Sequence, residues 1–315
     1  MRHLGKTDIL VTPVGLGVME LAGGGGLIGH MFPVIPLEEK NAIIKAALDG
    51  GINWFDTAEI YGAGVSERSL ATGLKAAGKT DQEVVIATKW MPLFRTAANI
   101  PHTIEDRLHF LDGYSIANYM VHQPIGFSSS EAEMNAMADL VEVGKIRSVG
   151  VSNFNSARMR RAHAALAKRG IPLAVNQVRY SLLHREIETN GVLETAKELG
   201  VTITAYSPVA RGLLTGKYHK DPSLLDKRTG WRKRSLRRNL EHTRPLINLM
   251  DEIAAGYHAT IAQVALNWLI NFTGEIVVTI PGATKVRQAE ESAGAMNFHL
   301  SADEMARIDV ASRNL

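Results

Sequence analysis

Short apolar or β-branched runs alternate with longer amphipathic segments along all 315 residues of the chain. This alternation predicts strands followed by helices, because a half-buried strand is a short apolar run whereas an amphipathic helix repeats its apolar positions every 3.6 residues. Strands are expected at eight places: 14–17, 53–56, 84–89, 116–122, 147–152, 173–178, 201–207 and 275–280.

Helical periodicity fills the spaces between these runs. Examples are 37–51, 66–78, 131–144 and 190–200, each of which ends at a glycine, as helix C-termini often do. Eight β-then-α units without a break in composition predict a single (β/α)8 TIM barrel domain over residues 1–315, with a doubly wound sheet as the alternative. The opening residues 2–11 predict a short β-hairpin ahead of the barrel.

Composition narrows the class of protein without naming a function. The chain is 45% hydrophobic and 21% charged, with a formal net charge of +3, which is typical of a soluble globular protein and demands no nucleic acid. The absence of cysteine excludes disulfides, thiolate catalysis and cysteine-ligated metals. No run approaches the roughly 18 to 20 apolar residues of a membrane span, and the N-terminus lacks a signal-peptide pattern. We therefore expect a cytoplasmic location and no membrane partner.

Polar side chains stand at the ends of the predicted strands. In a (β/α)8 barrel the C-terminal strand ends form one face, and active sites lie on that face. Asp56 alone also fits a turn or a helix cap. Lysine and histidine after an apolar strand are poor turn residues, however, and a buried lysine is costly unless it is paired. The set that favours a functional face is Asp56, Lys89, His122, Ser152, Gln177 and Ser207.

The spacing of three of these residues is regular. Lys89 follows Asp56 by 33 residues, and His122 follows Lys89 by another 33, which is about one strand-helix unit at each step. Tyr61, in the loop after the second strand, is placed to lie over the same rim. Lys89 would lower the pKa of Tyr61, Asp56 would keep Lys89 charged, and His122 would hydrogen-bond a carbonyl oxygen. This constellation predicts acid–base chemistry on a carbonyl.

Seven motifs in order along the chain resemble those of the aldo-keto reductase superfamily. They are GINWFDTAEIYG (51–62), TKW (88–90), VHQP (121–124), GVSNF (150–154), VNQVRYSLL (175–183), AYSPVARGLLTGKY (205–218) and IPGATKVRQAEES (280–292). The resemblance implies an NADPH-dependent reductase of aldehydes or ketones with a catalytic tetrad of Asp56, Tyr61, Lys89 and His122. In such enzymes hydride passes from C4 of the nicotinamide to the carbonyl carbon, and the tyrosine gives a proton to the oxygen.

The same resemblance implies a cofactor site. Ser152, Asn153 and Gln177 match residues that bind the nicotinamide carboxamide, and Tyr206 matches the aromatic that stacks on its ring. Ser207, Leu213 and Lys217 match residues that hold the pyrophosphate. The positions that match the adenosine and 2′-phosphate side are Gly282, Thr284, Lys285, Gln288, Glu291 and Ser292. The remaining positions expected near the cofactor are Gly17, Val18, Met19 and Pro208.

The sequence departs from the family pattern at two of these positions. Ser292 stands where many members have asparagine against adenine, and Met19 stands where many have an aromatic near the substrate. The second departure leaves the carbonyl substrate open. The charges of Lys285 and Arg287 at a predicted helix start favour the 2′-phosphate of NADPH over NADH, although both side chains also fit a solvated surface.

Three other features of the sequence do not indicate a different kind of site. The four glycines at 23–26 lack the spacing of a dinucleotide fingerprint and predict a flexible loop bordering the substrate site. GVSNF lacks the second glycine of a hydrolase nucleophile elbow. The histidines show no zinc-binding spacing, so no metal site is expected.

Residues 217–244 carry ten Lys or Arg against three Asp or Glu. This run fits a solvated loop and helix start and is weak as a nucleic-acid site. By analogy with the family, it is expected to be a loop that closes over the cofactor phosphates and becomes ordered only with them.

One alternative belongs to another class of protein. Residues 51–64 also resemble the barrel-shaped β subunits of voltage-gated potassium channels, which implies a non-catalytic, nucleotide-sensing partner. Those subunits tend to have asparagine at the position of His122, so the histidine favours the enzyme. The oligomeric state is left open by the sequence.

Overall fold

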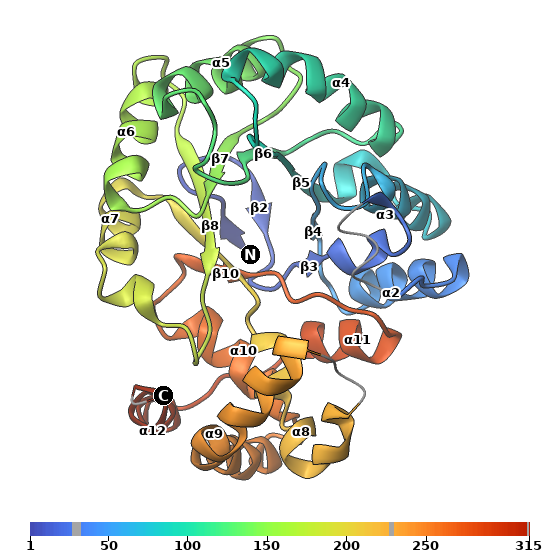
Figure 1. Ribbon diagram of the computed structural model, residues 1–315, viewed down its shortest axis with the longest axis vertical. Coiled ribbons are helices and arrows are strands. Elements are labelled where there is room, and N and C mark those ends of the chain that lie inside the picture. The colour runs from blue at the N-terminus through green and yellow to red at the C-terminus, as the bar shows by residue number, and fades with distance from the viewer. Residues whose placement is uncertain (27–32, 227–229, 314) are drawn as a thin grey trace.

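Eight parallel strands form the centre of the molecule (Figure 1). The computed structural model describes residues 1–26, 33–226, 230–313 and 315, with the backbone alone at 230–233 and 235. Strands that follow one another in the chain are neighbours in the sheet. All eight predicted strands are confirmed: β3 (Leu16–Gly17), β4 (Trp54–Asp56), β5 (Val85–Trp90), β6 (Asn118–Val121), β7 (Val149–Ser152), β8 (Leu173–Arg179), β9 (Thr202–Tyr206) and β10 (Val277–Thr279).

The two ends of this sheet meet and close the barrel. Parallel bridges join Val14 to Thr279 and Gly17 to Gly282. The Gly15 amide donates to the Thr279 carbonyl at 2.8 Å, and the Thr279 amide donates to the Pro13 carbonyl at 2.9 Å. A closed sheet with consecutive strand order confirms the (β/α)8 barrel and rules out the doubly wound alternative.

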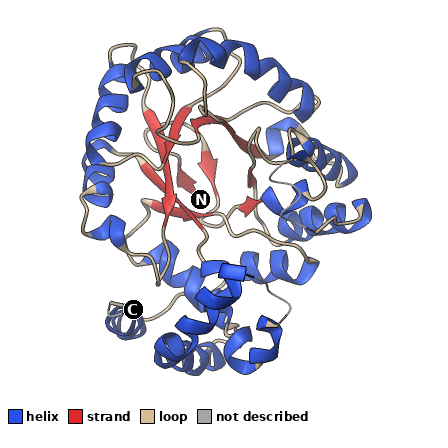
Figure 2. Ribbon diagram, in the orientation of Figure 1, coloured by secondary structure: helices blue, strands red, loops and turns tan. Residues whose placement is uncertain are grey.

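Helices surround the barrel on its outer face (Figure 2). Their ends follow local sequence signals. Ser129 and Thr260 accept hydrogen bonds from the first turns that follow them, and Gly200 ends a helix at a φ of +70°. The helices are α2 (Leu37–Asp49), α3 (Val65–Ala76), α4 (Ile100–Leu111), α5 (Ser130–Glu142), α6 (Ser156–Ala167), α7 (Val192–Leu199), α8 (Lys217–Lys220), α9 (Gly230–Gly256), α10 (Ile261–Asn271), α11 (Val286–Gly294) and α12 (Ala302–Ser312).

The predicted N-terminal hairpin is also present. Strands β1 (Arg2–His3) and β2 (Leu10–Val11) pair antiparallel, and the N-terminus lies over the barrel in Figure 1. Leu4 and Ile9 share a buried cluster with Trp54 near the start of β4 and Val85 at the start of β5. The hairpin therefore fills the N-terminal end of the barrel, which leaves the opposite end for a site.

The charged segment 217–244 is mostly helical where the structure describes it. It consists of α8, a 3₁₀ turn over Pro222–Leu225 and the first half of α9. Tyr218, Leu225 and Leu236 are buried, so apolar side chains spaced among the charges anchor the segment to the protein. The helix start was predicted, whereas the expected loop is largely absent from the described residues. Residues 227–229 lie outside the described part of the chain.

Among the described residues, no helix combines the length and apolar character that a membrane span requires.

Candidate active site

A cavity of about 250 Å³ lies at the C-terminal ends of the barrel strands. Active sites of (β/α)8 barrels lie at this end, where the polar residues at the strand ends were expected to lie together. Three members of the predicted tetrad and eight of the predicted cofactor residues line one space. The lining residues are Gly17, Met19, Glu20, Asp56, Tyr61, His122, Gln123, Ser152, Asn153, Gln177, Tyr206, Ser207, Ile280 and Gly282.

Beneath this cavity lies a buried ion pair from neighbouring strands. The Lys89 Nζ donates to Asp56 Oδ1 at 2.5 Å and to the Thr57 carbonyl at 2.7 Å. The two side chains are only 0% and 3% exposed. Gln177 Nε2 donates to the second Asp56 oxygen at 2.8 Å. The carboxylate thus has partners on both oxygens, as a buried charge requires.

Burial and pairing act in opposite directions on this ion pair. Burial raises the pKa of Asp56 and lowers the pKa of Lys89, while the attraction between the two groups opposes both changes. The predicted role of Asp56 as the partner that keeps a buried lysine charged is consistent with these contacts.

Tyr61 and His122 lie above this pair. The Lys89 Nζ is 5.1 Å from the centre of the Tyr61 ring. The rings of Tyr61 and His122 meet edge to face with centroids 5.7 Å apart. A phenol, an imidazole and an ammonium are therefore gathered at one end of the cavity, where they can donate hydrogen bonds to a substrate oxygen.

The pKa of Tyr61 differs from the expected direction. Burial, followed by the Asp56 carboxylate, raises the pKa of Tyr61 well above its ordinary value, whereas we expected Lys89 to lower it. The main reason is that the phenol is buried, and the Asp56 carboxylate, which accepts the hydrogen bond from Lys89, adds negative charge near it. Tyr61 is consequently a protonated phenol in this structure, which is the form that a proton donor needs.

His122 is a neutral imidazole. Burial, followed by the charge of Lys89, lowers the pKa of His122 to about 3. Its Nδ1 atom is buried and has no hydrogen-bond partner in the structure. A neutral ring can still donate one hydrogen bond from the other nitrogen to a substrate oxygen.

A further set of hydrogen-bonded polar side chains lines the same cavity. Ser152 Oγ donates to the Gln177 carbonyl at 2.9 Å, and Asn153 Nδ2 donates to Ser152 Oγ at 3.1 Å. The Tyr206 hydroxyl donates to Asn153 Oδ1 at 3.0 Å, and Asn153 holds a left-handed φ of +60°. Amide, hydroxyl and aromatic groups beside one another match the chemistry of a nicotinamide, which has a flat ring and a carboxamide.

Two glycines at the rim lie where the protein itself leaves no room for a Cβ atom. A Cβ at Gly17 would lie 3.0 Å from the Ile280 carbonyl oxygen, and a Cβ at Gly282 would collide with the Glu20 carboxyl group. The glycine-rich loop at 23–26 lies against residues 62–65, directly after Tyr61. The part of this region at 27–32 is outside the described residues.

Several predicted cofactor residues lie outside this cavity. The Val18 amide donates to the Asp56 carbonyl, so Val18 supports the rim from behind. Lys217 lies over the ring of Tyr218 at 5.0 Å, and Leu213 lines a different cavity, described below. Pro208 is buried directly after Ser207.

The remaining predicted cofactor residues lie just before α11 or along it. The Thr284 amide donates to Gln288 Oε1 at 2.7 Å. Lys285 is the N-cap residue, and its Nζ pairs with Glu39 at 2.8 Å. Two further predicted residues lie on the helix itself, where Ser292 is buried and Glu291 lies 3.9 Å from Arg287.

The sequence analysis missed Glu20. This residue follows Met19 in a 3₁₀ turn (Met19–Ala22) directly after β3, and it lines the cavity with Tyr61 and Gly282. Burial raises the pKa of Glu20 to about 7, against a hydrogen bond from its own backbone that lowers it. The sequence signal that could have identified Glu20 is its position just after the first strand, because Asp56 was identified by its position at the end of the second strand. Gln123, next to His122, was also missed.

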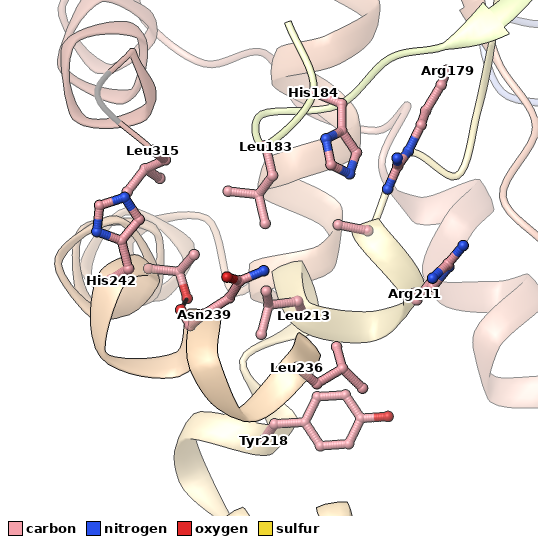
Figure 3. Close-up of a pocket in the computed structure, with 12 residues that line it drawn as sticks. Arg179, Leu183, His184, Arg211, Leu213, Tyr218, Leu236, Asn239, His242 and Leu315 are labelled. Atoms are coloured by element: carbon pink, nitrogen blue, oxygen red, sulfur yellow. Dashed lines mark hydrogen bonds between the residues drawn. The ribbon is translucent and has the colours of Figure 1, made fainter. Parts of the chain in front are cut away.

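A second cavity of about 230 Å³ lies beside Arg179, at the end of β8 (Figure 3). Its polar lining includes Arg179 at the end of β8, Arg211 in the 3₁₀ segment Ala210–Thr215 after β9, and the imidazoles of His184 and His242. The apolar lining comes from Leu183, Ala210, Leu213, Tyr218, Leu236 and Leu315. Arg179 pairs in register with Tyr206. Burial raises the pKa of Tyr206, and the charges of Arg179 and Arg211 oppose that change.

Among the described residues, no group of three or more histidine and acidic side chains is arranged to hold a metal ion.

Comparison with known proteins places this geometry in a family. Residues 13–313 match the Aldo/keto reductase family. A protein of Mycobacterium tuberculosis named as an uncharacterized oxidoreductase is 39% identical over 276 residues, covering 86% of this chain and 81% of the relative. The chloroplastic pyridoxal reductase of Arabidopsis thaliana is 32% identical over 317 residues, covering 96% and 84%.

Solved structures show the same architecture. A thermostable aldo-keto reductase in complex with the inhibitor epalrestat has a TM-score of 0.78 at 28% identity, with 98% of both chains covered. An aldo-keto reductase from Klebsiella pneumoniae, solved in complex with NADPH, has a TM-score of 0.75 at 23% identity, which shows a shared fold, with 98% of this chain and 94% of that chain covered. The chain belongs to the aldo/keto reductase family.

Proposed function

We propose that this protein reduces an aldehyde or a ketone to an alcohol with NADPH, and that Tyr61 donates the proton. The observation that carries the proposal is the position of Tyr61 and His122 in one cavity above the buried Lys89–Asp56 pair. Family membership supports the reaction class, and the NADPH in a structural neighbour supports the cofactor.

Some of these residues would hold the cofactor, and others would transfer the proton. NADPH supplies a hydride to the carbonyl carbon. Ser152, Asn153 and Gln177 would hold its carboxamide beside Tyr206, because their amide and hydroxyl groups already converge there. Fixing the ring in this way determines which face of the nicotinamide meets the substrate.

The raised pKa of Tyr61 keeps its proton in place until the substrate oxygen becomes negative. His122 donates a hydrogen bond to the same oxygen and orients it. When Tyr61 releases its proton, the ammonium of Lys89 beneath the ring stabilises the phenolate that forms. Asp56 and the Thr57 carbonyl hold Lys89 in that position.

The cavity lining bears on the substrate class. Among the described residues, no lysine or arginine lines the cavity, so those residues offer no cation to the charge of an anionic substrate. A neutral carbonyl compound suits this lining better. Pyridoxal belongs in a substrate panel because a relative is named pyridoxal reductase.

The non-catalytic, nucleotide-sensing alternative is not favoured. A sensor has no need for a proton donor, whereas this cavity holds both Tyr61 and His122.

A substrate screen tests the proposal. NADPH absorbance would be followed with aldehydes, ketones, sugars and pyridoxal, and with Tyr61→Phe as the matched control. We expect the wild type to oxidise NADPH with at least one carbonyl class and the variant to show no comparable rate. Tight NADPH binding without turnover across the whole panel would favour the sensing role instead.

A further inference from the structure

The carboxyl group of Glu20 lies at the seam between the first and last strands of the barrel. β3 and β10 meet there through the bridge between Gly17 and Gly282. The Glu20 carboxyl group occupies the space above Gly282 that a side chain at that position would need. It also lines the cavity shared by Tyr206 and Ser207.

This position is on the route that a bound dinucleotide would take. In the proposed function the nicotinamide end lies beside Tyr206, with Ser207 at the diphosphate, and the adenosine end lies at the start of α11. Gly282 is between these two places along the rim, because it follows β10 and precedes α11. A molecule that reaches from one to the other passes Gly282 and therefore meets Glu20.

We propose that Glu20 couples cofactor binding to proton uptake, because the diphosphate of the dinucleotide binds beside this carboxyl group only when it is protonated. The proposal rests on the cofactor site described above and adds a residue to it. Two negative groups in a partly dehydrated cleft repel each other, whereas a neutral carboxylic acid can donate a hydrogen bond to a phosphate oxygen.

The electrostatics of the cavity agree with this position. Burial raises the pKa of Glu20 to about 7, so the free protein holds a mixture of the charged and neutral forms near neutral pH. A bound diphosphate adds negative charge and raises that pKa further. Above pH 7, binding therefore takes up a proton, and affinity falls as pH rises.

Other groups that line the cavity do not produce this pH dependence. The pKa of His122 lies at about 3, and burial raises the pKa values of Tyr61 and Tyr206 above their ordinary values. Asp56 is held in the ion pair with Lys89. None of these three rings changes charge between pH 6 and 9.

Two further charged groups lie on the helices that pack behind the 3₁₀ turn of Glu20. Glu67 on α3 has a pKa raised by burial to about 7, but it bonds Arg107 and Thr88 and does not line the cavity. Lys40 on α2 bonds Ser69, whose hydroxyl reaches the Leu21 carbonyl. A variant at Glu20 alone separates its titration from both.

Calorimetry on the whole protein tests the proposal directly. NADPH would be titrated at pH 8 in two buffers of different ionisation enthalpy, which gives the number of protons taken up per cofactor bound. We expect an uptake approaching one proton. NADH, which lacks the 2′-phosphate and its own titration, should show the same uptake.

The pH dependence of affinity gives a second readout. Fluorescence titration should show the NADH dissociation constant rising about tenfold between pH 6 and pH 8, as expected for a required proton on a group with a pKa near 7. Glu20→Gln should remove this rise and bind as tightly at pH 8 as at pH 6. Glu105→Gln, which removes an exposed carboxylate on α4, should behave as the wild type.

The outcomes separate this inference from the proposed function. Failure of both cofactors to bind would remove the proposed function. Binding with no proton uptake at pH 8 in the wild type would overturn the role of Glu20 and leave the function standing. The wild-type calorimetry decides this even if Glu20→Gln does not fold.

Discussion

The two cavities are nearly equal in volume, at about 250 and 230 Å³, yet they are built differently. The cavity of the candidate active site is lined mainly from strand ends, and its Asp56 carboxylate is buried and paired with Lys89. The second cavity is lined by the end of β8, the segments that follow β8 and β9, helices α8 and α9, and the C-terminal residue. Both of its arginines are exposed.

This difference shows what identifies an active site in the molecule. Size alone does not separate the two cavities. The cavity of the candidate active site combines a buried ion pair with a neutral imidazole of strongly lowered pKa and a phenol of raised pKa. Ionisable groups with shifted pKa values cost free energy to bury, and such groups at strand ends are typical of catalytic sites. The exposed arginines of the second cavity carry no such cost.

The largest effect should follow the loss of the buried lysine. Lys89→Met leaves Asp56 buried with Gln177 as its remaining partner, which should cost about 3–5 kcal/mol of unfolding free energy. We also expect kcat/KM to fall by at least about 100-fold. Urea unfolding and steady-state kinetics measure the two losses.

The double variant Asp56→Asn with Lys89→Met provides the control. It removes both charges, so it should recover part of the lost stability but none of the activity. A single Lys89→Met protein as stable and active as the wild type would contradict the account of the ion pair.

A smaller loss is expected for Asp56→Asn alone. The asparagine keeps a hydrogen-bond acceptor for Lys89 but loses the charge, so kcat/KM should fall about tenfold. The measurement compares the loss of kcat/KM in Asp56→Asn with the loss in Lys89→Met. An Asp56→Asn enzyme as impaired as Lys89→Met would mean that the aspartate does more than hold the lysine.

Cofactor preference should respond moderately to Lys285. In the wild type NADPH should bind more than about tenfold tighter than NADH, because the start of α11 offers cations and free amides to a phosphate. Lys285→Ala should reduce this preference, and added salt should weaken it. Glu39→Gln frees Lys285 from its ion pair and should preserve or increase the preference. Equal affinities in the wild type would remove Lys285 from the site.

The smallest effect is expected in the second cavity. Arg179→Met keeps the length of the side chain and removes its charge. We expect kcat/KM and the NADPH dissociation constant to stay within about threefold of the wild type, because an exposed charge contributes little. A more than tenfold decrease in kcat/KM, or a more than tenfold increase in the dissociation constant, would show that the second cavity takes part in catalysis or cofactor binding.

The strands and the predicted tetrad positions were accessible from the sequence because both follow from local rules. Short apolar runs gave strand boundaries within two residues, and polar residues at their ends marked the rim. Asp56 and Lys89 form the pair that their spacing predicted. These features depend on the order of residues along one strand and its neighbour.

Features that depend on several distant segments were not accessible. The helical form of 217–244 depends on buried Leu225 and Leu236, which are hidden among charges in the sequence. The pKa of Tyr61 depends on its burial in the folded protein and then on the charges of Asp56, Glu20 and Tyr206 near it, so its direction was predicted wrongly. Glu20 was missed because only the closure of β3 on β10 brings it beside Gly282.

The role of Tyr61 is the central claim, and one pair of measurements on Tyr61→Phe tests it most directly. The variant keeps the aromatic ring and removes the hydroxyl proton, so NADPH affinity by fluorescence should stay within about threefold of the wild type. With a carbonyl substrate from the panel, kcat/KM should fall by at least about 100-fold, a loss near 2.7 kcal/mol of transition-state stabilisation. Retention of more than about a tenth of the wild-type kcat/KM would contradict Tyr61 as the proton donor.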